Sequence, residues 1–252
     1  LFKNLVLPDP FIPYASILCG VMGCKLVYDL VKLLSTSYVG LYTGLTKIQR
    51  IEWNNRGMST VHAVIITAIS FYFVFLSELF AIRISTTGVF TLKSSHLSTF
   101  TLGVSVGYFV ADLAMICWFF PCLGGLEYIL HHSLSAIAVA YSALTGEGQV
   151  YTFMVLLSEV TTPGINLRWF LDVSGLKKSS AYLVNGVVIF VGWVAARVLL
   201  FVYIFRHVYL HRAQVMKMQS FGSFLVMSVP LVLASMNVIW FGKILKGLRK
   251  TI

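Results

Sequence analysis

The chain has 252 residues, of which 58% are apolar and only 11% are charged, and its formal net charge is +10. Its mean hydropathy is +0.85. Soluble domains carry roughly a quarter charged residues, so this composition excludes the soluble classes and predicts one polytopic, all-α membrane domain. The basic residues cluster between apolar segments, where anionic headgroups attract them. We therefore expect membrane lipids as partners and no nucleic acid.

Seven apolar segments are long enough to cross a bilayer, which takes about 20 helical residues. The first segment is the weakest, because Lys25, Asp29 and Lys32 interrupt it, and six spans is the alternative prediction. The predicted spans are Pro13–Leu34, Thr60–Ile82, Leu97–Phe120, Leu126–Leu144, Gln149–Leu171, Ala181–Phe205 and Phe221–Leu245.

Lysine and arginine are distributed unevenly over the connections between these spans. With seven spans, nine of these residues fall on one side of the membrane and six on the other. Positive charge is enriched in cytoplasmic loops, so we expect a cytosolic C-terminus. The last four residues, RKTI, resemble a dibasic retrieval signal, although an ordinary basic flank has the same pattern. The expected location is the endoplasmic reticulum or another endomembrane.

Ionisable side chains inside spans are costly in lipid unless they face the bundle interior or a wet cavity, so each is a candidate for function. Asp29 and Glu78 lie near predicted span ends and are weaker candidates. The deeper ionisable residues are Asp112, His131, His132, Glu159 and Arg197.

Polar residues recur at helical spacing in the third, fourth and fifth predicted spans. Such stripes need an interior to face, and three of them indicate a common polar chamber enclosed by helices. The predicted chamber residues are Tyr108, Asp112, Tyr128, His131, His132, Ser135, Glu159, Thr162, Asn166 and Arg197.

The fifth span contains a second irregular feature, Pro163 followed by Gly164. Proline removes a backbone donor and frees the carbonyl of Glu159. Broken backbone at membrane depth is tolerated where it is buried in protein or lines a cavity. A plain helix kink is the equal alternative.

The adjacent histidines can serve as a general base or nucleophile, with Asp112 or Glu159 orienting a ring, or they can simply bond neighbouring helices together. His207 and His211 have a spacing that suits a metal ion, but their arginine- and tyrosine-rich surroundings favour an interfacial belt. The four cysteines form no CxxC pair, so we expect no metal site.

Five motifs in order, IEWNNRGMSTVHA, GYFVADL, LHHSLSAIA, SEVTTPGINLRWFL and MNVIWFGKILKG, together resemble the TLC domain family, and in particular the subgroup named TLC domain-containing protein 4. The resemblance covers the chain from about residue 50 onward. It implies a six-helix TLC barrel at 46–252, preceded by an N-terminal transmembrane helix and loop at 1–45. It also implies a role in membrane lipid handling.

Ceramide synthases belong to the wider family and transfer an acyl chain from acyl-CoA to the amine of a sphingoid base. Their signature begins with a histidine pair, matched here by His131 and His132. Its two aspartates fall at Glu159 and Thr162, and its later glutamate falls at Asn166. Only one of these carboxylates is therefore retained, which leaves the acid/base arrangement of the synthases incomplete.

Three functions follow from these observations. The first is a lipid-binding protein that contributes to sphingolipid or phospholipid homeostasis. The second is a membrane acyltransferase with catalytic His131 and His132, oriented by Glu159 or Asp112, for which acyl-CoA would be the co-substrate. The third is a proton-coupled transporter, for which the repeated halves common in transporters are not visible. We expect no other cofactor, and the sequence leaves a homo-oligomer open.

Overall fold

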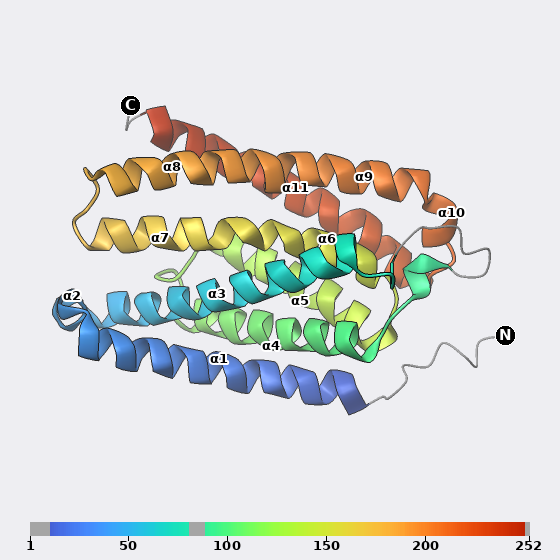
Figure 1. Ribbon diagram of the computed structural model, residues 1–252, viewed down its shortest axis with the longest axis horizontal. Helices are drawn as coiled ribbons and strands as arrows, with labels where there is room; N and C mark the ends of the chain where they lie inside the picture. Colours follow the sequence, from blue (N-terminus) through green and yellow to red (C-terminus); the bar gives the residue numbers. More distant parts are fainter. Residues whose placement is uncertain (1–10, 81–88, 250–252) are drawn as a thin grey trace.

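The computed structural model describes residues 11–80 and 89–249, and within these residues the chain is helical with no β-strand. The helices run roughly along one direction, side by side (Figure 1). Four helical stretches are long and apolar enough to cross a membrane: Lys47–Leu76, His96–Trp118, Ser180–Leu210 and Ser220–Gly247. The prediction of an all-α membrane bundle is thus confirmed.

The described elements follow the predicted spans with shifted ends. The helix α1 covers Phe11–Tyr38, and α2 is a short turn at Gly40–Gly44. The remaining elements are α3 (Lys47–Phe71) with its π-helical end η1 (Tyr72–Leu76), η2 (Phe90–Leu92), α4 (His96–Trp118), α5 (Leu126–Thr145), α6 (Gln149–Leu156), η3 (Leu157–Thr161), α7 (Thr162–Val173), α8 (Ser180–Trp193), η4 (Val194–Leu199), α9 (Leu200–Leu210), α10 (Arg212–Val215) and α11 (Ser220–Arg249).

The helix α3 begins well before Thr60, where the sequence placed the start of the second span. The Thr46 hydroxyl accepts the Gln49 N–H at 3.2 Å, and the Gln49 side chain accepts the Thr46 N–H at 3.0 Å. This capping box satisfies two end donors and fixes the helix start at Lys47. The helix ends at Leu76 with η1, and the predicted end at Ile82 lies outside the described residues.

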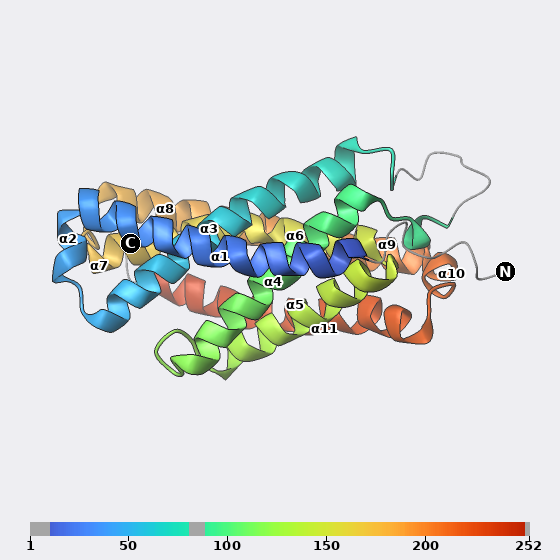
Figure 2. The same ribbon diagram turned by 90° about the horizontal axis from the view of Figure 1, so that it is seen from below.

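The N-terminal helix α1 lies along the outside of the bundle and packs on α4 (Figure 2). A Cβ atom on Gly20 would come within 2.3 Å of the Val104 carbonyl oxygen, and one on Gly107 within 2.4 Å of the Ile17 carbonyl oxygen. In lipid, where no hydrophobic force drives helices together, such close backbone approach provides the packing attraction. The glycines therefore attach α1 to α4.

One end of the bundle is closed by a buried polar network. The side chain of Gln149 is fully buried and accepts the Ser98 hydroxyl at 2.6 Å. Its amide donates to Thr99 and to the Ser142 carbonyl at 3.1 and 3.2 Å. The turn that leads into Gln149 relies on Gly148, whose φ of 68° favours glycine. These contacts join α4, α5 and α6 at the end opposite to α2 (Figure 1).

Candidate functional site

A cavity of about 330 Å³ lies between the helices in the half of the bundle that carries α2 and the C-terminal end of α11. All the predicted chamber residues except Ser135 line it. Ser135 lines a second, narrower pocket instead. The walls of the two cavities come from α3, α4, α5, the α6–η3–α7 stretch, the α8–η4 stretch and α11, and no described residue of α1 takes part.

Two departures from α-helical geometry meet at the cavity. The fifth span changes into the 3₁₀ turn η3 at Leu157, and α7 starts at Thr162 with Pro163 in its first turn. Proline is well placed there, because its missing N–H is not needed in a first turn. Opposite, η4 is a π-helical turn that carries Arg197. The irregular backbone just before Pro163 therefore borders the cavity through Glu159 and Thr162. Backbone that departs from α-helical geometry at membrane depth must be buried in protein or line a cavity.

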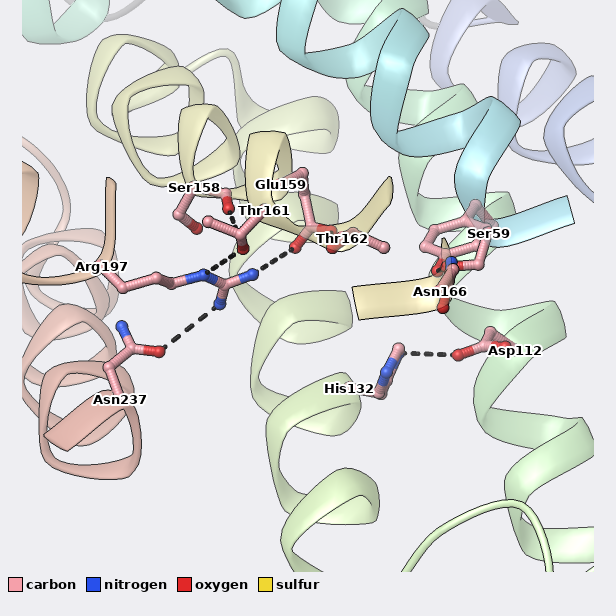
Figure 3. A network of polar contacts seen from close by, with 11 residues as sticks. Ser59, Asp112, His132, Ser158, Glu159, Thr161, Thr162, Asn166, Arg197 and Asn237 are labelled. Atoms are coloured by element: carbon pink, nitrogen blue, oxygen red, sulfur yellow. Dashed lines mark hydrogen bonds and ion pairs between the residues drawn. The ribbon is translucent and has the colours of Figure 1, made fainter. Parts of the chain in front are cut away.

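The Glu159 and Arg197 side chains face each other across these two turns (Figure 3). Their closest charged atoms, Oε1 and Nη2, are 3.7 Å apart. Glu159 also accepts the Thr162 hydroxyl at 2.7 Å. Arg197 donates to the Thr161 hydroxyl at 3.1 Å and to Asn237 Oδ1 at 3.5 Å. The arginine thus links η3, η4 and α11, and its charge is balanced within the protein.

The second buried carboxylate, Asp112, faces His132 (Figure 3). Its Oδ2 lies 3.3 Å from His132 Nδ1, a distance suited to an ion pair when the ring is protonated. The geometry of this contact does not meet that of a hydrogen bond. Its Oδ1 accepts a 2.7 Å hydrogen bond from the Asn55 amide. Asp112 is only 4% exposed, so these neighbours define its environment.

The His131 ring points in a different direction from that of His132, as expected for adjacent residues on a helix. It packs edge-on against Trp240 with ring centroids 5.6 Å apart, and its plane stands at 82° to that of His132. Its Nδ1 is buried without a hydrogen-bond partner among the described residues. His131 lines both the polar cavity and the narrow pocket.

Asn166 joins α7 to α3 beneath the cavity. Its amide donates to the Thr60 hydroxyl at 2.9 Å and to the Arg56 carbonyl at 3.1 Å, and its Oδ1 accepts from the Arg56 guanidinium at 3.1 Å. Arg56 in turn forms a two-bond pair with Glu52 at 2.9 and 2.7 Å. The residue at the later glutamate position of the synthase signature therefore makes interhelical contacts here.

Several cavity residues on α3 were not predicted, because the sequence places the start of that span at Thr60. They include Glu52, Asn55, Arg56 and Ser59. Ser59 accepts the Tyr108 hydroxyl at 3.1 Å, and the Tyr108 ring stacks on His62 with centroids 3.8 Å apart. Asn55, Ser59 and His62 have i, i+4 and i+7 spacing, so a polar helical stripe could have identified this face.

The narrow pocket measures about 50 Å³ and lies beside the polar cavity, along α5, α6 and α11. Phe109, His131 and Glu159 line both spaces. Most of its other lining residues are apolar, among them Val139, Val155, Leu225, Val229 and Leu233. Tyr141 and Met218 lie toward the end closed by the Gln149 network, where the Tyr141 hydroxyl donates to the buried Glu147 carboxylate at 2.6 Å.

The side chain of His207 points into the bundle, whereas the interfacial belt predicted for His207 and His211 would place it on the surface. The helix α9 extends to Leu210, beyond the predicted span end at Phe205, and His207 is buried within it. Its Nδ1 lies 3.2 Å from the Tyr151 hydroxyl, and its ring packs 4.2 Å from that of His211. Tyr209 and Arg212, by contrast, make a cation–π contact near the helix end.

The TLC domain matches residues 52–246. The chain belongs to the TLC domain family. It is 29% identical over 229 residues to TLC domain-containing protein 4-B of Xenopus laevis, covering 87% of this chain and 82% of that protein. It is 26% identical over 220 residues to human TLC domain-containing protein 4, covering 84% of this chain and 79% of that protein.

A third relative is Topoisomerase I damage affected protein 4 of Saccharomyces cerevisiae, at 26% identity over 171 residues, covering 64% of this chain and 59% of that protein. Every residue that lines either cavity lies within the 52–246 range of the TLC domain. The cavities therefore belong to the part of the chain that the family shares, and α1 precedes it.

Proposed function

We propose that this TLC domain protein binds a membrane lipid in its interior and contributes to sphingolipid or phospholipid homeostasis. The observation that carries the proposal is that a polar cavity of about 330 Å³ adjoins a narrow apolar pocket and shares lining residues with it. An amphiphile has the same two parts, a polar head and an apolar chain. The head would occupy the polar cavity, and the chain would extend between α5 and α11.

The placement of His131 and Glu159 supports this arrangement, because both residues line the two spaces where they join. An ester or amide group, which connects head and chain in a lipid, would lie at that junction. Arg197 is linked to Glu159 there and carries further donors. Polar groups buried in a bilayer bundle typically mark a ligand pathway.

Acyl transfer is the second candidate, and the His132–Asp112 approach of 3.3 Å favours it. In that reaction His132 would take the proton of an acceptor amine or hydroxyl as the acceptor attacks the thioester carbonyl of acyl-CoA. The C–S bond would break, and the thiolate would receive the proton. Thr162 and Asn166 occupy two carboxylate positions of the synthase signature, and their neutral side chains donate to Glu159 and Thr60 instead, which supports binding over catalysis.

We also propose an endomembrane location with a cytosolic C-terminus, and a division into an N-terminal transmembrane helix with its loop at 1–45 and a TLC domain at 46–252. The cavity reaches Lys243 near the C-terminal end of α11, whose side chain is 65% exposed. In this topology the lipid head would be reached from the cytosol. A glycosylation acceptor added after residue 252 should then remain unmodified, and its modification would contradict the orientation.

Lipid extraction tests the proposed function directly. The purified chain should retain a lipid identifiable by mass spectrometry, and the His131→Ala/His132→Ala variant should retain at least about tenfold less, since His131 lines both spaces and His132 lines the polar cavity. His96→Ala, which changes an exposed histidine outside both cavities, is the control. Histidine-dependent acylation of an acceptor from labelled acyl-CoA would favour the transferase. Failure to retain or take up any lipid would refute both.

A further inference from the structure

The charged side chains around the polar cavity differ in whether a side chain of opposite charge lies beside them. Arg56 is paired with Glu52, Arg197 with Glu159, and Lys243 with Glu127 at the rim. Among the described cavity residues, Asp112 is the carboxylate without an arginine or lysine partner. Its polar contacts are the neutral Asn55 amide and the His132 ring. Asp112 is therefore an acidic side chain of the inner cavity that faces an amide and a histidine ring instead of an arginine or lysine.

The unoccupied polar atoms at the same place are acceptors or can act as acceptors. Asn55 uses its amide nitrogen on Asp112, and its Oδ1 is buried without a partner among the described residues. His131 Nδ1 is also buried and without a hydrogen bond in this part of the chain. A neutral imidazole nitrogen that carries no hydrogen accepts a hydrogen bond. Buried acceptors of this kind are satisfied by a ligand that donates.

We propose that the inner cavity selects lipids whose head presents hydrogen-bond donors, as a hydroxyl or ammonium group does, and rejects phosphate and carboxylate heads, with Asp112 as the selecting residue. This inference rests on the proposed lipid-binding function and narrows its ligand class. A donor head would meet Asp112, Asn55 Oδ1 and His131 Nδ1 together. An anionic head would face the Asp112 carboxylate in a site of low dielectric, where like charges repel strongly.

The proposal accounts for the position of the cationic residues. Arg56 and Arg197 line the same cavity as Asp112, but each is engaged with its own glutamate. Neither arginine is therefore an unpaired cation ready to bind a phosphate. Arg168 also lines the cavity and has no carboxylate partner among the described residues, but its guanidinium lies over the Tyr182 ring and donates to the Tyr182 carbonyl at 3.4 Å. The selection thus follows from Asp112, which has no cationic partner on a wall where Arg56 and Arg197 are already paired.

The test uses the full chain in a nonionic detergent and four ligands with one identical saturated chain. Their heads are a glycerol monoester, a primary amine, a carboxylic acid and a monophosphate. Native mass spectrometry measures the Kd of each ligand. The glycerol monoester and the amine should bind on the order of tenfold or more tightly than the two anions. The stronger of the two donors identifies whether hydroxyl or ammonium is the preferred head.

Asp112→Asn keeps the side-chain shape and removes the charge. It should weaken amine binding by about tenfold or more and strengthen binding of both anions. Asp172→Asn, which removes an exposed carboxylate paired with Lys177 at 2.8 Å outside the cavity, should leave all four Kd values unchanged.

Equal binding of all four heads to the wild type, or unchanged selectivity in a folded Asp112→Asn variant, would overturn the inference while leaving lipid binding intact. Absence of binding by every ligand would overturn the proposed function together with it. Because the wild-type comparison decides the selectivity by itself, the inference stays falsifiable even if the variant does not fold.

Discussion

Arg197 and Glu159 face each other 3.7 Å apart on two helical turns that both depart from α-helical geometry, a π turn and a 3₁₀ turn. The guanidinium is 5% exposed and also bonds Thr161 and Asn237. This contact connects the fifth, sixth and seventh predicted spans at the inner wall of the cavity.

Removal of the arginine should destabilise the protein strongly. Arg197→Met leaves the Glu159 carboxylate buried without a cation, and breaking a buried pair in this way costs about 3–5 kcal/mol. Thermal unfolding in detergent should show a clear fall in Tm. The double variant Arg197→Met/Glu159→Gln should recover much of the loss, because no uncompensated charge remains. Equal Tm values for the single and double variants would show that the two residues are not coupled.

Asn55 should stabilise the fold through Asp112. Replacement by leucine removes the 2.7 Å hydrogen bond to a buried carboxylate, and a hydrogen bond to a charged group contributes about 1.5–3 kcal/mol. Thermal unfolding measures the expected loss. Ser235→Ala serves as the matched control, since that hydroxyl is exposed and bonds only its own helix at the Leu231 carbonyl. Identical Tm values for the two variants would contradict a role for Asn55.

The attachment of α1 should depend on the small residue at position 20. Gly20→Val would force its side chain into the Val104 backbone, and overpacking of this kind costs about 1–3 kcal/mol. Gly23→Val on the same helix meets nothing within 4 Å and is the control. Lipid retention should survive in Gly20→Val, because no described α1 residue lines a cavity. Loss of lipid together with stability would show that α1 supports the site.

Glu147 should hold the connection between α10 and α11 in place. Its Oε2 accepts both the Tyr141 hydroxyl at 2.6 Å and the Gln219 backbone N–H at 3.0 Å. Glu147→Leu should therefore speed hydrogen exchange of the Gln219 amide by about tenfold or more, because a lost hydrogen bond lowers the local opening free energy. Glu147→Gln keeps an acceptor and should stay near the wild-type rate. Unchanged exchange in Glu147→Leu would contradict this role.

Much of the site could be read from helical spacing, because a polar residue in an apolar span must face the interior. That rule placed Tyr108, Asp112, His132, Glu159 and Arg197 in one chamber, and the structure brings them to the wall of one cavity. It failed for Asn55 and Arg56. The charged residues near them lowered the hydropathy of that segment, while the Thr46 capping box extends the helix through it.

The sequence by itself determined that this chain is an all-α membrane protein. Its apolar segments have the length of transmembrane helices, and in lipid a helix satisfies every backbone hydrogen bond within the segment. It also determined which side chains must avoid lipid. Only the tertiary structure decided that Asp112 approaches His132 while Glu159 approaches Arg197. Those pairings depend on how each helix is rotated and where its backbone departs from α geometry, and hydropathy does not specify either.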